Sequence, residues 1–182
     1  MTTPLPATAS VGLARLNGMT PADAKRALHD CCGSSAWADA VSRQLPVRDD
    51  AELYAMADRV WWSLGAGDWM EAFRAHPRIG ERAAAGERGR GRDARSTSWS
   101  AQEQATADLA SPDERSALAE ANKVYEARFG HIFLICASGK SADQIVHEIH
   151  ARLGNSAEQE LVVAAEEQRR ITRLRLARLL AS

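Results

Sequence analysis

The stretch SAEQELVVAAEEQRRITRLRLARLL occupies residues 156–180 and predicts one long helix. Ser156 is a suitable N-cap, because its hydroxyl can accept a hydrogen bond from a backbone N–H of the first helical turn. Apolar residues lie almost all the way round the helical wheel. On that wheel Ile171, Arg175 and Leu179 share one row, which places a charged side chain among apolar neighbours.

Helix start and stop signals recur through the rest of the chain. Caps of the Ser, Thr or Asp type and stops of the Gly or Pro type predict helices over 20–33, 34–45, 49–64, 68–75, from Ser100 onward, 111–129 and 141–153. The apolar run 131–137 has the composition of a strand but no recognisable partner, so we expect an extended connector there. The sequence therefore predicts an all-α fold, a single compact domain of about eight helices with no significant sheet.

The chain of 182 residues has the length of one domain with a sizeable core. We expect residues 1–18 to form a flexible N-terminal lead-in and residues 19–182 to form the helical domain. Within that domain the stretch AAAGERGRGRDARSTS at 83–98 is rich in Gly and Arg and has no apolar period. It predicts an exposed loop.

Composition excludes several classes of protein. Apolar residues make up 45% of the chain, charged residues 26%, and the formal net charge is −1, so nothing favours nucleic acid or an anionic membrane surface. No apolar run approaches the roughly 18–20 residues of a membrane span. An odd count of three cysteines and no secretory leader pattern favour a cytoplasmic protein without a disulfide scaffold.

Two polar motifs are candidates for chemistry. His76 follows a predicted helix end in AHPRIGE at 75–81. An imidazole there can transfer protons near neutral pH. Alternatively, it is a surface histidine that is stabilised at the helix C-terminus by the helix dipole. Ser100, Glu103 and Gln104 form S-x-x-E-Q at a helix start. This pattern is a capping box, or a carboxylate and an amide beside free N–H groups that could hold an anionic or carbonyl-bearing ligand.

Buried polar positions add further candidates. Asn122 interrupts an apolar helical row, so it needs a hydrogen-bond partner or lines a site. Arg175 and Arg178 lie on the last helix, and each is well placed to bind the carboxylate of a ligand. Alternatively, each extends along an apolar surface and places its charged end in solvent. His147 and His150 lie three residues apart around Glu148, but a second Glu-x-x-His motif is missing, so a metal site is weakly indicated.

Taken together, five motifs resemble the OHCU decarboxylase family, whose substrate is 2-oxo-4-hydroxy-4-carboxy-5-ureidoimidazoline (OHCU), an intermediate between urate and allantoin. In chain order they are AHPRIGE at 75–81, S-x-x-E-Q at 100–104, N-x-x-Y-x-x-x-F-G at 122–130, FLICA at 133–137 and RRITRLRL at 169–176. The resemblance covers roughly residues 20–180. It departs from the animal members in a longer stretch between His76 and Ser100.

The resemblance implies an all-α homodimer that decarboxylates OHCU, a small-molecule substrate, to (S)-allantoin without a cofactor or metal. His76 matches the catalytic histidine of the family, Glu103 its acidic partner, and Arg175 an arginine that faces the substrate. The implied substrate-binding residues are Pro77, Ser100, Gln104, Phe133, Leu134, Ile135, Cys136 and Ala137. Two alternatives are a non-catalytic helical interaction domain and a metal-dependent hydrolase that uses His147 and His150.

Overall fold

The structure is a computed structural model that describes residues 9–79, 98–100, 102 and 111–182. Its helices are α1 (Val11–Asn17), α2 (Pro21–Cys32), α3 (Ser35–Ser42), α4 (Asp50–Ser63), α5 (Ala66–Arg74), α7 (Pro112–Phe129), α8 (Ala142–Arg152) and α9 (Ala157–Ala181). Residues 98–100 and 102 are also helical. All regular secondary structure in these ranges is helical, so the predicted all-α fold is confirmed.

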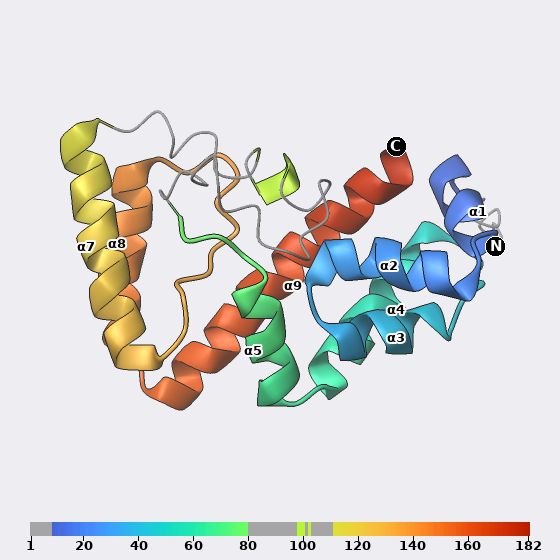
Figure 1. The fold of residues 1–182 in the computed structure, drawn as a ribbon, viewed down its shortest axis with the longest axis horizontal. Coiled ribbons are helices and arrows are strands. Elements are labelled where there is room, and N and C mark those ends of the chain that lie inside the picture. The colour runs from blue at the N-terminus through green and yellow to red at the C-terminus, as the bar shows by residue number, and fades with distance from the viewer. Residues whose placement is uncertain (1–8, 80–97, 101, 103–110) are drawn as a thin grey trace, which may run out of the picture.

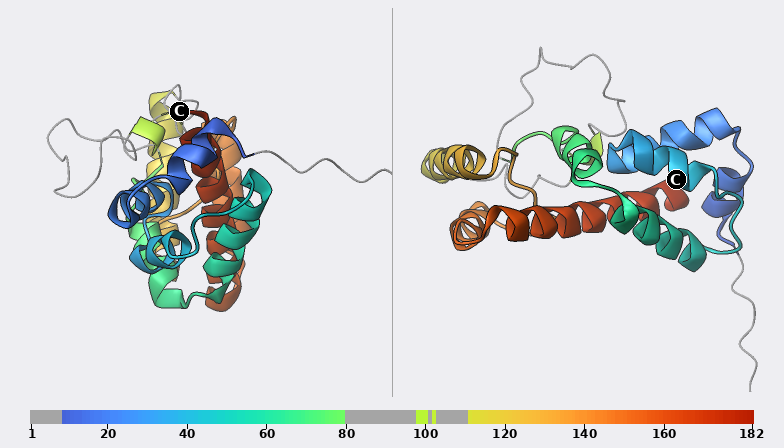
Figure 2. Two further views of the ribbon diagram at one scale, coloured as in Figure 1. Left: turned by 90° about the vertical axis from the view of Figure 1, so that its right-hand side faces the viewer. Right: turned by 90° about the horizontal axis from the view of Figure 1, so that it is seen from below.

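The long helix α9 is the axis on which the other elements are arranged. It runs along the molecule from the end where α7 and α8 lie side by side to the end where α1 to α4 pack (Figures 1 and 2). Helices α1, α2, α4 and α5 all contact it directly. Although α9 has 25 residues, no described helix is both long and apolar enough to cross a membrane.

The buried apolar side chains form two clusters. The larger cluster lies between α1 to α5 and α9, and its bulkiest buried members include Leu13, Leu28, Trp37, Trp61 and Phe73. The smaller cluster lies between α7, α8 and the 131–137 connector, and includes Leu118, Tyr125, Phe133, Ile145 and Ile149. The two clusters meet along the connector, which contributes side chains to both.

The connector 131–137 is extended, as expected, and not a strand. Ile132, Leu134 and Cys136 pack on the larger cluster, whereas Phe133, Ile135 and Ala137 belong to the smaller one. This strict alternation is the side-chain geometry of an extended backbone. The segment therefore separates the two apolar clusters and contacts both, which explains why every position from 132 to 137 is apolar.

The N-terminal region differs from the prediction of a flexible lead-in over 1–18, because α1 forms part of the core. Leu13 and Leu16 are fully buried there. Gly12 lies directly against Leu180 of α9, and a Cβ at that position would stand 1.9 Å from the carbonyl oxygen of Leu180. The missing side chain is thus what allows the two helices to touch, and tertiary packing overrides a weak local signal. Residues 1–8 lie outside the described residues.

Local signals placed the other helix ends within a few residues. Ser111, Ser141 and Ser156, all predicted as helix starts, accept hydrogen bonds from the third residue of their helices in full capping boxes. Helix α2 ends at Gly33 in the left-handed conformation that favours glycine. The predicted Arg-Gly loop at 83–98 lies outside the described residues except for Ser98.

Candidate active site

A pocket lies between the end of α5, the connector and the middle of α9. It contains about 370 Å³ of space, counting the solvent at its mouth. Eight residues predicted for the site line it: His76, Pro77, Ser100, Phe133, Leu134, Ile135, Cys136 and Ala137. Ile79 and Ile171 also line it and were not predicted, although Ile171 shares a helical row with Arg175. Residues from four separate stretches of the chain therefore converge here.

His76 occupies the first turn beyond α5. Its backbone N–H donates to the carbonyl oxygen of Phe73 at 3.1 Å, which closes the helix end, and Pro77 then prevents any continuation. Only 9% of the histidine is exposed. The chain thus turns away from the helix and leaves the imidazole in the pocket wall.

Helix α7 holds the backbone that follows His76. Arg78 donates two hydrogen bonds to the carboxylate of Glu126, at 2.5 and 2.9 Å. Asn122 donates from Nδ2 to the carbonyl oxygen of Ile79 at 3.1 Å. Asn122 therefore ties down backbone, one of its two expected roles. Glu126 was missed, although it lies one helical turn after Asn122 on the same face.

Arg175 and Ser100 form a polar pair beside the pocket. The Nη2 of Arg175 donates to the hydroxyl oxygen of Ser100 at 3.0 Å, and 2% of the arginine is exposed. Arg175 does not itself line the pocket, so it stands one residue behind Ser100. Arg178, the other candidate, is only partly buried near the end of α9. Its burial and its contact with Ser100 favour Arg175 over Arg178 as the arginine of the candidate site.

The connector wall is bound from behind by two charged side chains. The N–H of Cys136 donates to Oε2 of Glu167 on α9 at 2.8 Å. The carbonyl oxygen of Leu134 accepts from Nη1 of Arg152 on α8 at 2.8 Å. Neither charged residue lines the pocket, and neither was predicted from the sequence, since no local pattern points to these backbone partners.

The sequence model of the OHCU decarboxylase family matches residues 17–177 of the chain. This protein belongs to the OHCU decarboxylase family. The match covers nearly the whole domain, including every predicted site residue. The fold is consistent with that membership, and so is the convergence of four of the five motifs on one pocket.

Relatives of this protein support the same assignment. It is 38% identical over 151 residues to the "Uric acid degradation bifunctional protein TTL" of Arabidopsis thaliana, a match over 82% of this chain and 45% of that protein. It is 36% identical over 75 residues to a 2-oxo-4-hydroxy-4-carboxy-5-ureidoimidazoline decarboxylase of Xenopus laevis, over 41% of this chain and 43% of that protein. The matches thus span about half the length of these relatives.

Solved structures show the same fold. A crystal structure of OHCU decarboxylase in the presence of (S)-allantoin superposes with a TM-score of 0.71 at 35% identity, over 85% of this chain and 96% of that one. A crystal structure of (S)-allantoin synthase superposes with a TM-score of 0.65 over 93% of this chain and 53% of that one. At 17% identity, the second likeness concerns the fold alone.

Two residues that the family resemblance assigns to the site, Glu103 and Gln104, lie outside the described residues. Their neighbours Ser100 and Gln102 are helical, and Ser100 is buried in the pocket wall. The assignment of Glu103 as the acidic partner of His76 therefore stays a prediction.

Cys32 lies behind the pocket at the end of α2. Burial raises the pKa of its thiol to about 12, although a hydrogen bond with Thr172 and the charge of Arg175 oppose the shift. The thiol is therefore neutral at physiological pH. A neutral, fully buried thiol is a poor nucleophile, so Cys32 is not a candidate for a catalytic group.

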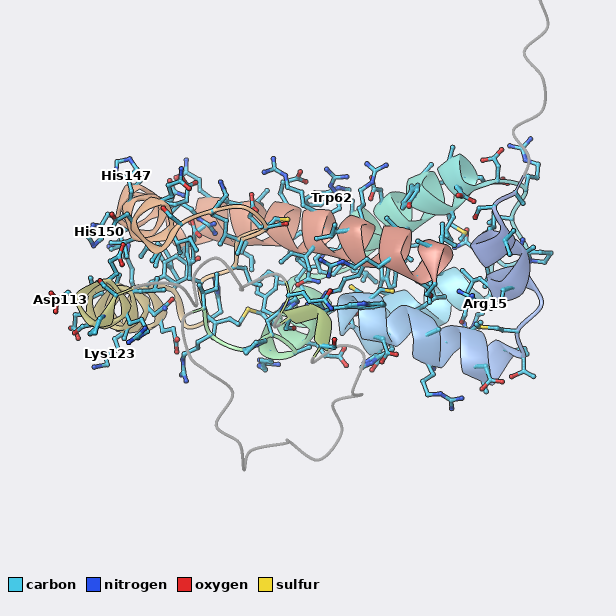
Figure 3. The ribbon with its side chains drawn as sticks, turned by 90° about the horizontal axis from the view of Figure 1, so that it is seen from above. Arg15, Trp62, Asp113, Lys123, His147 and His150 are labelled. Atoms are coloured by element: carbon cyan, nitrogen blue, oxygen red, sulfur yellow. The ribbon has the colours of Figure 1, made fainter. Side chains whose placement is uncertain are left out.

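The histidines considered for a metal site lie far from the pocket. His147 and His150 are exposed on α8, at the outer end of the molecule (Figure 3). Among the residues that the structure describes, no group of three or more His, Cys, Asp or Glu side chains is placed to hold a metal ion.

Proposed function

We propose that this protein decarboxylates OHCU to (S)-allantoin, with His76 in proton transfer. Family membership and the similarity to an OHCU decarboxylase crystallised in the presence of (S)-allantoin support the reaction. The observation that carries the proposal is the pocket, in which His76, Ser100 and the 133–137 connector meet with Arg175 directly behind.

The reaction needs one proton to be delivered to carbon. Breaking the bond between the ring carbon and the carboxylate releases CO2 and leaves its electron pair to be delocalised toward a ring carbonyl. A proton must then be added to one face of the neighbouring ring carbon, which carries the ureido group, while the 4-hydroxyl loses its proton and becomes a ring carbonyl. His76, buried at the pocket wall, is proposed to deliver this proton or to take one from the 4-hydroxyl. Glu103 is proposed to orient the imidazole.

The rest of the pocket is suited to an anionic ligand that is rich in amide groups. Arg175 brings a positive charge to Ser100, which lines the pocket, and so stabilises negative charge that develops on the substrate. The extended connector directs the N–H and C=O groups of alternate residues to opposite edges. Because Leu134 and Cys136 bond to Arg152 and Glu167 on one edge, the polar groups of Ile135 face the other.

We also propose that Pro77 and Gln104 contact the substrate, and that the protein acts as a cytoplasmic homodimer. The reaction scheme requires no metal or organic cofactor, because the substrate carbonyl accepts the electron pair. Light scattering after size-exclusion chromatography measures the assembly. A mass of one chain, 19.8 kDa, would exclude the dimer.

The decisive experiment supplies OHCU freshly made from urate and follows allantoin by circular dichroism. The expected result is a rate and an excess of the S enantiomer well above those of the spontaneous reaction. Replacing His76 by Ala lowers kcat on the order of 100- to 10,000-fold, because a positioned proton donor is lost. A wild-type rate equal to the spontaneous one would show that the protein is not this enzyme.

Glu103→Ala separates the enzyme from a helical interaction domain. If Glu103 only caps a helix, the substitution costs about 1 kcal/mol of stability and changes no rate. If Glu103 orients His76, activity is lost while the protein still folds. The first outcome contradicts the role that we propose for this carboxylate.

A further inference from the structure

The wall of the pocket depends on a backbone segment without secondary structure of its own. Residues 132–137 belong to no helix, and their side chains alternate between the two apolar clusters. Apolar packing on both faces fixes the segment against motion toward either cluster. It does not fix the segment along its in-plane edges, where the backbone polar groups point.

Two charged side chains supply that missing constraint, and both act on one edge. Leu134 and Cys136 are two residues apart, so the C=O of the first and the N–H of the second point the same way in an extended backbone. Nη1 of Arg152 donates to that C=O at 2.8 Å, and Oε2 of Glu167 accepts from that N–H at 2.8 Å. The two bonds come from α8 and α9 and so tie the segment to both helices.

Glu167 is itself well held. Its other oxygen, Oε1, accepts from Nη1 of Arg170 at 2.8 Å, and 13% of its side chain is exposed. Glu167 also lies one helical turn before Ile171, which lines the pocket. A charged acceptor makes a stronger hydrogen bond than a neutral one, so this bond to Cys136 is a firm anchor.

We propose that Glu167 is a positioning residue for the decarboxylation. It holds residues 133–137, which form one wall of the pocket, in the position that orients the substrate against His76. Arg152 is the second anchor of the same edge. This inference rests on the proposed function. Glu167 touches no substrate, and it acts only through the Cys136 peptide group.

Three variants of neighbouring residues test this role. Glu167→Ala removes the acceptor, while Glu167→Gln keeps an amide oxygen that can accept from the Cys136 N–H. Glu166→Ala is the matched control, because Glu166 is the preceding acidic residue of α9 and pairs with Arg169 and Arg170. It removes the same charge from the same helix.

The measured quantities are kcat/KM on fresh OHCU, the enantiomeric excess of the allantoin, and the rate of amide hydrogen exchange over 133–137. Enzyme concentrations are adjusted so that all variants match the total rate of the wild type. The spontaneous reaction then contributes the same share in each case. Without this adjustment a slow variant would yield more racemic product for a trivial reason.

Glu167→Ala is expected to lower kcat/KM roughly tenfold, to lower the enantiomeric excess and to speed amide exchange at Cys136, because a displaced wall loosens the substrate. Glu167→Gln restores all three values to within about twofold, and Glu166→Ala leaves them at wild-type level. Wild-type stereoselectivity and exchange in Glu167→Ala would overturn the inference. If the wild type itself fails on OHCU, the proposed function fails, while amide exchange still reports whether Glu167 holds the wall.

Discussion

The part of the chain that the structure describes contains two buried arginines, Arg152 and Arg175, whose surroundings differ in kind. Arg152 of α8 is paired with Glu160, whose carboxylate is completely buried, with Nε of the arginine 2.8 Å from Oε1 of the glutamate. Its guanidinium also lies 4.5 Å from the ring centre of Phe133. Arg175 of α9 donates to the hydroxyl of Ser100, which lines the pocket.

This difference indicates a structural role for Arg152 and a role at the pocket for Arg175. A buried charge that meets a buried carboxylate is neutralised within the protein, so the Arg152 pair can only hold neighbouring elements in place. Arg175 reaches the pocket through the hydroxyl of Ser100, so its charge lies beside the space in which we propose that the substrate binds. The connector joins the two regions, because Leu134 bonds to Arg152 and also lines the pocket.

The largest expected effect is the loss of the internal pair. Glu160→Ala is expected to lower the free energy of unfolding by about 3–5 kcal/mol, because it leaves Arg152 charged and buried without its carboxylate. Urea denaturation measures this loss. The control is Glu158→Ala, an exposed acidic residue of the same first turn, which should leave the midpoint nearly unchanged. Equal effects of the two substitutions would remove the distinction between the two arginines.

The second-largest effect is expected for a substitution of Arg175, beside the pocket. Arg175→Lys keeps the charge but loses the planar fork, and it is expected to lower kcat/KM about 100-fold. The same change at Arg178, three residues on and only partly buried, serves as the control and should stay within about twofold. Steady-state rates with fresh OHCU measure both. Full activity of Arg175→Lys would place Arg175 with the architectural residues.

A smaller effect tests the periphery of the Arg152 pair. The hydroxyl of Tyr125 donates to Glu160, and burial together with this bond raises the pKa of the tyrosine well above its usual range. Tyr125→Phe is expected to cost about 1–2 kcal/mol of stability, because Glu160 loses one of its donors. Activity should stay within about threefold of wild type. A loss of activity without a loss of stability would contradict the structural role of this network.

The smallest effect at neutral pH is expected from Cys32→Ala, and it grows with pH. The folded protein favours the neutral thiol, with a pKa of about 12, so its contribution to stability is complete below about pH 9 and is lost as pH rises toward 12. The wild type should therefore lose stability more steeply than Cys32→Ala between pH 9 and 11. Urea midpoints across this range measure the slopes, and Cys136→Ala is the control. Parallel slopes would mean that Cys32 is not shielded as described.

The helices were predictable because their signals are local. Ser111 and Gly130 bound α7 as expected, since a cap and a left-handed glycine act within one turn of their own helix. The pocket residues His76 and Ser100 were found through their motifs. Helix α1 was missed, because its place in the core depends on the contact of Gly12 with Leu180, at the other end of the chain.

The sequence by itself determined an all-helical domain and an extended apolar connector, and through its family resemblance it indicated eight of the residues that line the pocket. Only the tertiary structure decided which buried polar groups are partners. Ser100 and Arg175 are 75 residues apart, and Cys136 and Glu167 are 31 apart. Periodicity and capping depend on neighbours within a turn or two, whereas the partner of a buried charge is whichever group the packed helices bring within 3 Å.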